Sequence, residues 1–219
     1  MSGLKRAIVL GGTGLVGTQL TQLLLNDSRF GKVVFISRRP LKLSHPKLQI
    51  LLVDFDDLEE YKLEFQGDVL FSCLGTTIKK AKTKENQYKV DFTYQYDIAK
   101  FCAENEVPNY VLVSSIGANA KSNSFYPKIK GELELAVQKL NFKTCAILRP
   151  SFLEGDRAEF RLGEKIGLII IKLISIFPFL KKYHGIKASI VAKGMIVCDQ
   201  QNIAGILESH EIKKVVKDS

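Results

Sequence analysis

The sequence has few of the residues that hold small or secreted domains together. Its 219 residues include no tryptophan, three histidines and four cysteines, which lie far apart at Cys73, Cys102, Cys145 and Cys198. There is no CxxC pair and no histidine cluster, so the pattern supports neither a zinc site nor a disulfide framework. A chain of this length buries enough surface to fold without such links. We therefore expect reduced, mostly buried thiols, no metal and a cytoplasmic location.

Long hydrophobic runs are also absent. The most apolar stretch, Ile166–Leu180, is interrupted by Lys172 and Pro178 and is shorter than the ~20 residues that a membrane span requires. The N-terminus shows no small-residue cleavage pattern after Lys5 and Arg6. We expect no membrane span and no export signal. Whether Ile166–Leu180 is a core helix or an interface stays open, and with it a homodimer or a protein partner.

The charge balance is basic but does not favour a nucleic-acid partner. Lysine and arginine number 32 against 23 acidic residues, for a net charge of +9, and only seven of the cations are arginines. The densest run, Lys79 to Lys84, has no interleaved aromatic residues on which bases could stack. A solvated, lysine-rich loop is the simpler interpretation.

Short apolar runs alternate with helical patterns through the first 150 residues. The runs are residues 7–10, 32–36, 48–53, 69–73, 110–113 and 144–148. They are continuous rather than alternating, as expected for a parallel sheet covered on both faces by helices. The pattern predicts an α/β fold with a Rossmann-like, doubly wound parallel sheet. After Pro150 the pattern is mostly helical, so we expect a Rossmann domain over 1–150. Residues 151–219 would form a small substrate-pocket region that is not an independent domain.

A glycine-rich loop follows the first apolar run. Its residues are Gly11, Gly12, Thr13, Gly14, Leu15, Val16 and Gly17. The loop satisfies both GxGxxG and GxxGxxG, and it lies between a predicted strand and a predicted helix, as a dinucleotide site requires. The glycines let the backbone approach a pyrophosphate, and the helix N-terminus supplies N–H donors for it. A purely structural turn is the alternative.

The end of the second predicted strand lacks an acidic residue. NAD sites place Asp or Glu there to accept a hydrogen bond from the ribose 2′-OH, whereas this sequence reads Ser37, Arg38, Arg39. Arginine can bind a phosphate through two parallel hydrogen bonds. We therefore expect residues 1–150 to bind NADP(H), with Arg38, and with less support Arg39 and Ser37, at the 2′-phosphate. The alternative is an arginine that points to solvent, more so for Arg39.

Two further segments are expected to line the cofactor. Asp54 follows the third predicted strand and could accept a hydrogen bond from the adenine amino group. Cys73, Leu74 and Gly75 end the fourth strand, where the backbone usually lines the dinucleotide, and Gly75 permits close approach. The Cys73 side chain is interpreted as packing rather than as a reactive group.

Candidate catalytic residues follow the fifth predicted strand. Ser114 and Ser115 end that strand, and Tyr126 and Lys130 lie four residues apart near the start of the next helix, hence on one face. A free tyrosine, with a pKa near ~10, is a poor acid–base at neutral pH, but a neighbouring ammonium favours the phenolate. A serine hydroxyl can hold the substrate oxygen while the tyrosine transfers a proton.

With these motifs in place, the sequence resembles the short-chain dehydrogenase/reductase superfamily. It is most similar to the atypical, NAD(P)H-binding branch of the HIV Tat-interacting proteins and their bacterial relatives. The resemblance rests on GGTGLVG, SRR, FSCLGTT, SSIGANAKSNSFYPKIKGELE, LRPSFLEGDR and HGIKASIVAKGM. It implies Ser115 as the catalytic serine, with Ser114 in reserve, and places Pro150 near the nicotinamide.

The resemblance leaves the reaction open. It is compatible with an NADP(H)-dependent oxidoreductase acting on an unknown small molecule, in which Tyr126 is the acid–base and Lys130 binds the nicotinamide ribose. The alternative is an NADPH-binding regulatory or protein-interaction protein, and a lesser alternative is a sugar-nucleotide epimerase. We expect specificity to lie in the loop from Ser151 to Arg161. The last residues, 213–219, resemble a frayed polar end.

Overall fold

The computed structural model describes residues 3–154 and 185–219. Its main feature is a parallel sheet with the strand order β3-β2-β1-β4-β5-β6-β9. These strands are β1 (Lys5–Leu10), β2 (Phe30–Ser37), β3 (Leu48–Leu52), β4 (Val69–Ser72), β5 (Asn109–Val113), β6 (Thr144–Arg149) and β9 (Gly205–Glu208). Two short strands, β7 (Leu153–Glu154) and β8 (Ile186–Lys187), pair with each other. The sheet order reverses direction at β1, which is where such folds bind ligands.

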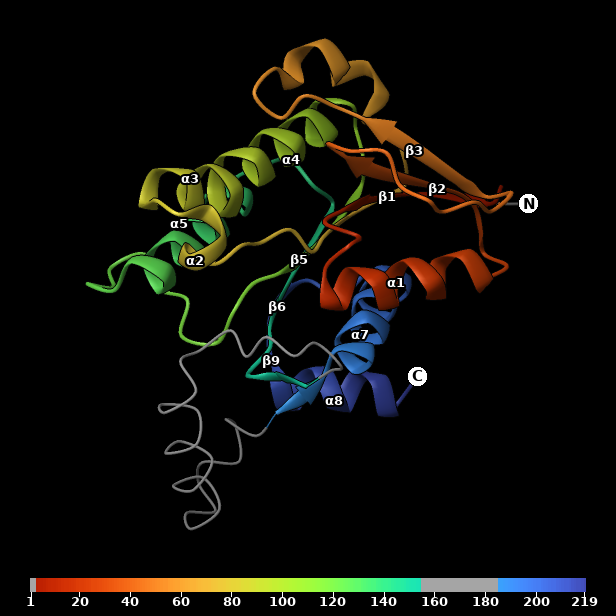
Figure 1. The fold of residues 1–219 in the computed structure, drawn as a ribbon. Helices are drawn as coiled ribbons and strands as arrows, with labels where there is room; N and C mark the ends of the chain where they lie inside the picture. Colours follow the sequence, from red (N-terminus) through yellow and green to blue (C-terminus); the bar gives the residue numbers. More distant parts are fainter. Residues whose placement is uncertain (1–2, 155–184) are drawn as a thin grey trace.

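Helices cover both faces of the sheet (Figure 1). The α-helices are α1 (Leu15–Asn26), α2 (Ile78–Ala81), α3 (Lys84–Tyr88), α4 (Tyr94–Glu104), α5 (Phe125–Val137), α7 (Ala188–Gln200) and α8 (Ser209–Lys217). The described residues also form a 3-10 helix, η1 (Leu58–Glu64), and a π-helical turn, η2 (Lys89–Thr93). One apolar core lies under α1 and α7, the other under α4 and α5.

Strand composition explains this burial. The central strands are almost fully buried, with β1 ending Ala7-Ile8-Val9-Leu10 and β4 reading Val69-Leu70-Phe71-Ser72. Successive side chains point to opposite faces, so Val9 and Phe71 enter the core under α1 while Ile8 and Leu70 enter the core under α4. The predicted doubly wound α/β fold is confirmed, and all the predicted strands are present.

The C-terminal segment joins the same sheet. Strand β9, which the sequence pattern did not predict, pairs with β6, so Ile206 lies opposite Ile147 at the sheet edge. Helix α8 extends to Lys217 and begins with a capping box between Glu208 and Glu211, so the expectation of a frayed end at 213–219 was wrong. The division of the chain at residue 150 stays a prediction.

Two sequence expectations concern segments that are not placed. The apolar stretch Ile166–Leu180 and most of the loop from Ser151 to Arg161 lie outside the described residues. Within the described ranges, no helix is long and apolar enough to cross a membrane. In the same ranges, no group of three or more His, Cys, Asp or Glu side chains is arranged to hold a metal ion.

Candidate functional site

The carboxyl ends of the central strands meet at one edge of the sheet, because all the strands run parallel. The Cys73 amide donates to the Leu10 carbonyl (2.8 Å), which joins the end of β4 to the glycine loop. The Ser114 amide donates to the Leu148 carbonyl (2.8 Å), and the Ile116 amide to the Pro150 carbonyl (3.0 Å). These hydrogen bonds bring the glycine loop, the Cys73 segment, the two serines and Pro150 to the same edge, as the motif positions predicted.

The glycine loop is packed so closely that side chains would not fit. Gly11 has φ +80°, and a Cβ there would lie 2.4 Å from the Leu74 nitrogen. A Cβ at Gly17 would lie 2.3 Å from the Gly11 carbonyl oxygen. Gly14 is the N-cap of α1 and has no side chain to cap it, so the first turn presents its N–H groups toward the loop. This cradle fits the pyrophosphate of a dinucleotide.

A cavity of about 330 Å³ lies beside the end of β2. It is lined by Arg38, Val53, Asp54, Phe55, Asp56 and Tyr94. The Tyr94 hydroxyl donates to Asp56 Oδ1 (2.8 Å), and Lys89 Nζ lies 3.0 Å from the same oxygen. Burial, together with the bond to Asp56, raises the pKa of Tyr94 to about 12, so its hydroxyl remains a donor at neutral pH. Arg38 and Asp54 thus lie together, as a 2′-phosphate and an adenine would require.

The other two residues of this motif do not line the cavity. The Ser37 hydroxyl donates to the Arg39 carbonyl (2.7 Å) and accepts from the Arg39 amide (3.2 Å), which closes a local turn. Arg38 and Arg39 are both exposed, and only Arg38 belongs to the cavity wall. Of these three residues, only Arg38 lines the cavity, where Asp54 also lies.

Lys130, in α5, takes part in a buried ion pair. Its side chain is 3% exposed, and its Nζ lies 2.9 Å from Oδ1 of Asp91, whose side chain is fully buried. The Thr76 amide donates to the other oxygen, Oδ2 (3.3 Å). A Cβ at Gly75 would lie 3.2 Å from Asp91 Oδ1 and 3.7 Å from Lys130 Nζ. The predicted cofactor-lining glycine therefore lies directly against the predicted catalytic lysine.

Tyr126 lies one helical turn before Lys130, at the start of α5. Lys130 Nζ is 5.9 Å from the centre of the Tyr126 ring. The tyrosine side chain is 38% exposed, so a ligand can reach it. Pro127, in the first turn of α5, requires no N–H partner there. Tyrosine and lysine therefore share one helix face, as the spacing predicted.

The two serines at the end of β5 have different surroundings. The Ser114 hydroxyl is buried and donates to Glu134 Oε1. The Ser115 hydroxyl is partly exposed and makes a long hydrogen bond to the Ile116 carbonyl (3.3 Å). Because Ser114 is committed to Glu134, Ser115 is better placed to contact a substrate.

Glu134 continues the face that carries Tyr126 and Lys130. It is 2% exposed and accepts from Arg149 at the end of β6, with Arg149 Nε 3.0 Å from its Oε1. The bond to Glu134 raises the pKa of Arg149 above its ordinary value. Through Ser114 and Arg149, Glu134 fixes α5 against the ends of β5 and β6 and so fixes the spacing of the serine, tyrosine and lysine.

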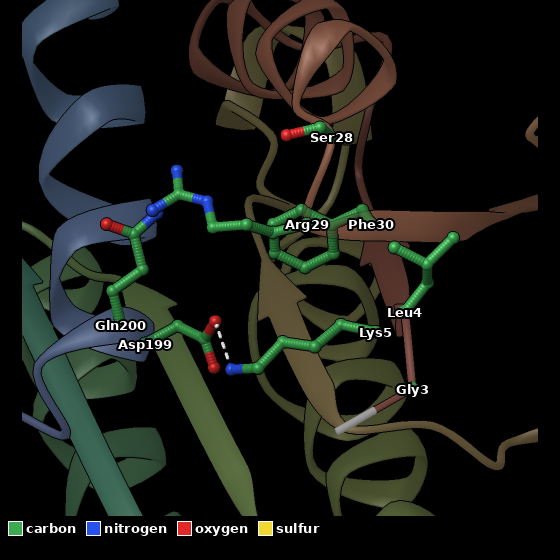
Figure 2. A pocket seen from close by; sticks show the side chains of 8 residues that line it. All are labelled: Gly3, Leu4, Lys5, Ser28, Arg29, Phe30, Asp199 and Gln200. Atoms are coloured by element: carbon green, nitrogen blue, oxygen red, sulfur yellow. Dashed lines mark hydrogen bonds and ion pairs between the residues drawn. The ribbon is translucent and has the colours of Figure 1, made fainter. Parts of the chain in front are cut away.

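A cavity of about 550 Å³ lies at the other ends of the strands, away from this edge (Figure 2). Lys5 Nζ there lies 2.8 Å from Oδ2 of Asp199, whose Oδ1 accepts from the side-chain amide of Asn109 (2.8 Å). Arg29 and Gln200 also line the cavity. None of the predicted site residues lies here.

The sequence reasoning missed Asp91, Tyr94, Glu134 and Arg149. No signal in the sequence pointed to Asp91, because Gln87, Asp91 and Gln95 repeat every four residues as a polar stripe, although all three are buried in the structure. Such a polar stripe usually marks the solvent side of a helix. Glu134 follows Lys130 by four residues, as Lys130 follows Tyr126, so the same spacing could have predicted that it lies on this helix face. Tyr94 and Arg149 carry no comparable signal.

The four cysteines are free thiols, and Cys102 and Cys198 are buried. Burial raises the pKa of Cys73 to about 12 and that of Cys145 to about 11. Cys73 Sγ contacts Met195 Sδ at 3.6 Å, so its side chain packs against α7. The interpretation of Cys73 as a packing residue agrees with this contact.

Comparison with solved structures shows the same fold. The Bordetella bronchiseptica enzyme WbmH, in complex with NAD+, is similar with a TM-score of 0.72 and 16% identity, covering 98% of this chain and 80% of that chain. The human epimerase family protein SDR39U1, with NADPH, is similar with a TM-score of 0.59 and 18% identity, covering 92% and 72%. At these identities the likeness concerns the fold alone.

Comparison of sequences identifies the family. The model of the NAD(P)H-binding family matches residues 11–158. Protein FMP52, mitochondrial, from Eremothecium gossypii is 32% identical over 96% of this chain and 97% of its own length. Protein HTATIP2 from Rattus norvegicus is 37% identical over 73% of this chain and 67% of its own length. The chain belongs to the NAD(P)H-binding family of atypical short-chain dehydrogenase/reductases.

Proposed function

We propose that the protein is an NADP(H)-dependent oxidoreductase that interconverts a carbonyl and an alcohol on a small-molecule substrate. The contact of Gly75 with the Lys130–Asp91 pair carries this proposal. It places a YxxxK lysine against the strand end that lines the dinucleotide in this fold. Tyr126 lies one helical turn before Lys130 in α5, and Ser115 follows the end of β5.

The cofactor would lie across the strand ends. The glycine loop, Gly11 to Gly17, would hold the pyrophosphate, and Asp54 the adenine amino group. Arg38 would pair with the 2′-phosphate, which makes NADP(H) the preferred cofactor. The backbone at Cys73, Leu74 and Gly75, together with Pro150, would line the nicotinamide half.

The chemistry requires one hydride and one proton. A bound nicotinamide cofactor supplies the hydride for reduction of a carbonyl carbon. The Tyr126 hydroxyl gives its proton to the carbonyl oxygen, so that an alcohol and a tyrosinate result, and the Ser115 hydroxyl donates a hydrogen bond to that oxygen. Lys130 stabilises the tyrosinate by its charge and binds the nicotinamide ribose. Oxidation runs through the same groups in reverse.

A second candidate function is an NADPH-binding regulatory or protein-interaction protein. The neutralised charge of Lys130 favours it, because an ammonium paired with Asp91 stabilises a tyrosinate less than a free one. A sugar-nucleotide epimerase remains a lesser alternative, and its support is limited to the shared fold. The cytoplasm remains the expected compartment, and the mitochondrial name of the Eremothecium relative makes mitochondria the alternative.

A Tyr126→Phe variant tests the catalytic proposal. NADPH oxidation is measured against a panel of aldehydes, ketones and sugar nucleotides, and NADPH affinity is measured separately by fluorescence. We expect unchanged affinity with turnover lower by ~10²–10⁴, which is the usual contribution of a positioned acid. Turnover that survives the substitution would contradict the role of Tyr126. No turnover by the wild-type protein on any substrate, with tight NADPH binding, would favour the regulatory function.

A further inference from the structure

The Lys130–Asp91 pair is more deeply buried than the other described ion pairs. Its two side chains are 3% and 0% exposed, whereas Lys5, in the pair with Asp199, is 35% exposed. Buried charges are costly to desolvate, and such a pair is seldom retained for stability alone. The carboxylate is also fixed in place by the Thr76 amide, which donates to it from the strand end that lines the cofactor.

The local backbone explains why Asp91 points inward. Asp91 lies in the π-helical turn η2, which continues directly into α4. A π-helical turn inserts an extra residue and shifts the helix face, and such turns are frequent at functional sites. Gln95, one turn later, holds the Asp91 carbonyl with its side-chain amide (3.0 Å) and accepts from the Ser72 hydroxyl (2.8 Å). These bonds join the backbone at Asp91 to β4, while the carboxylate itself is held by the Thr76 amide and by Lys130.

The sign of the local charge matters for a nicotinamide. The oxidised ring carries a positive charge and the reduced ring is neutral, so a nearby unpaired ammonium would disfavour the oxidised form. In a buried site, an uncompensated charge acts strongly over several ångströms. A carboxylate 2.9 Å from the ammonium opposes that field and weakens it.

We propose that Asp91 is a positioning residue that neutralises Lys130 and thereby sets the relative affinity of the protein for NADP+ and NADPH. The proposal rests on the proposed placement of the nicotinamide ribose beside Lys130. Neutralisation of Lys130 would explain why a buried carboxylate lies at a site that is proposed to bind an anionic cofactor. A merely structural role would affect both redox forms of the cofactor equally.

A double-mutant cycle tests this role at fixed pH and ionic strength. The dissociation constants of NADP+ and NADPH are measured by calorimetry for wild type, Asp91→Asn, Lys130→Met and the double variant. We expect Asp91→Asn to raise the ratio Kd(NADP+)/Kd(NADPH) about ten-fold, because the ammonium loses its counter-charge. Lys130→Met should move the ratio in the opposite direction, and the double variant should return it to within about two-fold of wild type.

Controls separate charge from folding. Asp199→Asn also breaks a lysine–aspartate pair whose carboxylate is buried, but at the opposite strand ends, so it should lower the melting temperature and leave the ratio unchanged. Asp91→Ser, a second neutral variant, should raise the ratio as Asp91→Asn does, whatever the folding yield of either one.

The outcomes distinguish this inference from the proposed function. Equal changes in both dissociation constants for Asp91→Asn and Asp91→Ser would overturn the role of Asp91 while leaving the NADP(H) site intact. A Lys130→Met variant with wild-type affinity for both forms would instead overturn the placement of the nicotinamide at Lys130.

Discussion

Replacing Glu134 by Gln tests how the site is held together. The substitution keeps the shape of the side chain but removes the charge that binds Arg149, and it leaves one carbonyl oxygen as an acceptor. Removing one partner of a fully buried pair costs about 3–5 kcal/mol. Arg149 is 21% exposed and can recover part of its hydration, so we expect a loss of about 2–3 kcal/mol in the free energy of unfolding.

The assay is urea unfolding followed by circular dichroism, with Glu132→Gln as the matched control. Glu132 lies on the same helix and pairs with Lys128 at 3.9 Å, with Lys128 52% and Glu132 30% exposed. That pair is expected to contribute less than about 0.5 kcal/mol. The melting temperature of Glu134→Gln should fall by roughly 4–12 °C for a chain of this size. Equal stability of the two variants would refute the reasoning that Glu134 anchors α5.

Two further predictions concern the loop and the thiols. Gly17→Ala should abolish NADPH binding, because the new Cβ would lie 2.3 Å from the Gly11 backbone oxygen; tight binding in a fluorescence titration would contradict this. Burial raises the pKa of Cys73 and Cys198 to about 12 and that of Cys145 to about 11, above the ordinary value of a thiol. As the pH rises above ~9, these thiols ionise in the unfolded chain before they ionise in the folded protein. The free energy of unfolding, which is highest below pH ~9, should therefore fall by about 1.4 kcal/mol per pH unit for each thiol. The midpoint of urea unfolding is measured in the presence of a reductant, and equal midpoints at pH 8 and pH ~10 would contradict this prediction.

The sequence was sufficient for the sheet and the glycine loop because both depend on local patterns. Continuous apolar runs identify strands buried on both faces, and the glycines occur in a fixed order between a strand and a helix. Strand β9 escaped notice because Gly205 to Glu208 is a short, largely exposed edge segment with Leu207 buried. Its pairing with β6 is a long-range contact that no local pattern encodes.

The site was predicted only where its residues follow one helix or one loop. Tyr126 and Lys130 share a helix face, so their spacing was sufficient. Asp91 comes from a different element and enters through a π-helical turn, which alters the periodicity on which such reasoning depends. The partner of Lys130 therefore became visible only from the packing of η2 against α5.

The most direct test of the central claim is a comparison of NADPH and NADH affinities by fluorescence titration. Charge-assisted hydrogen bonds contribute about 1.5–3 kcal/mol, so NADPH should bind at least about ten-fold more tightly than NADH. Arg38→Met should remove that preference, and Arg39→Met, at an exposed position outside the cavity wall, should retain it. Binding of NADH as tight as or tighter than that of NADPH in the wild-type protein would contradict an NADP(H) site at Arg38.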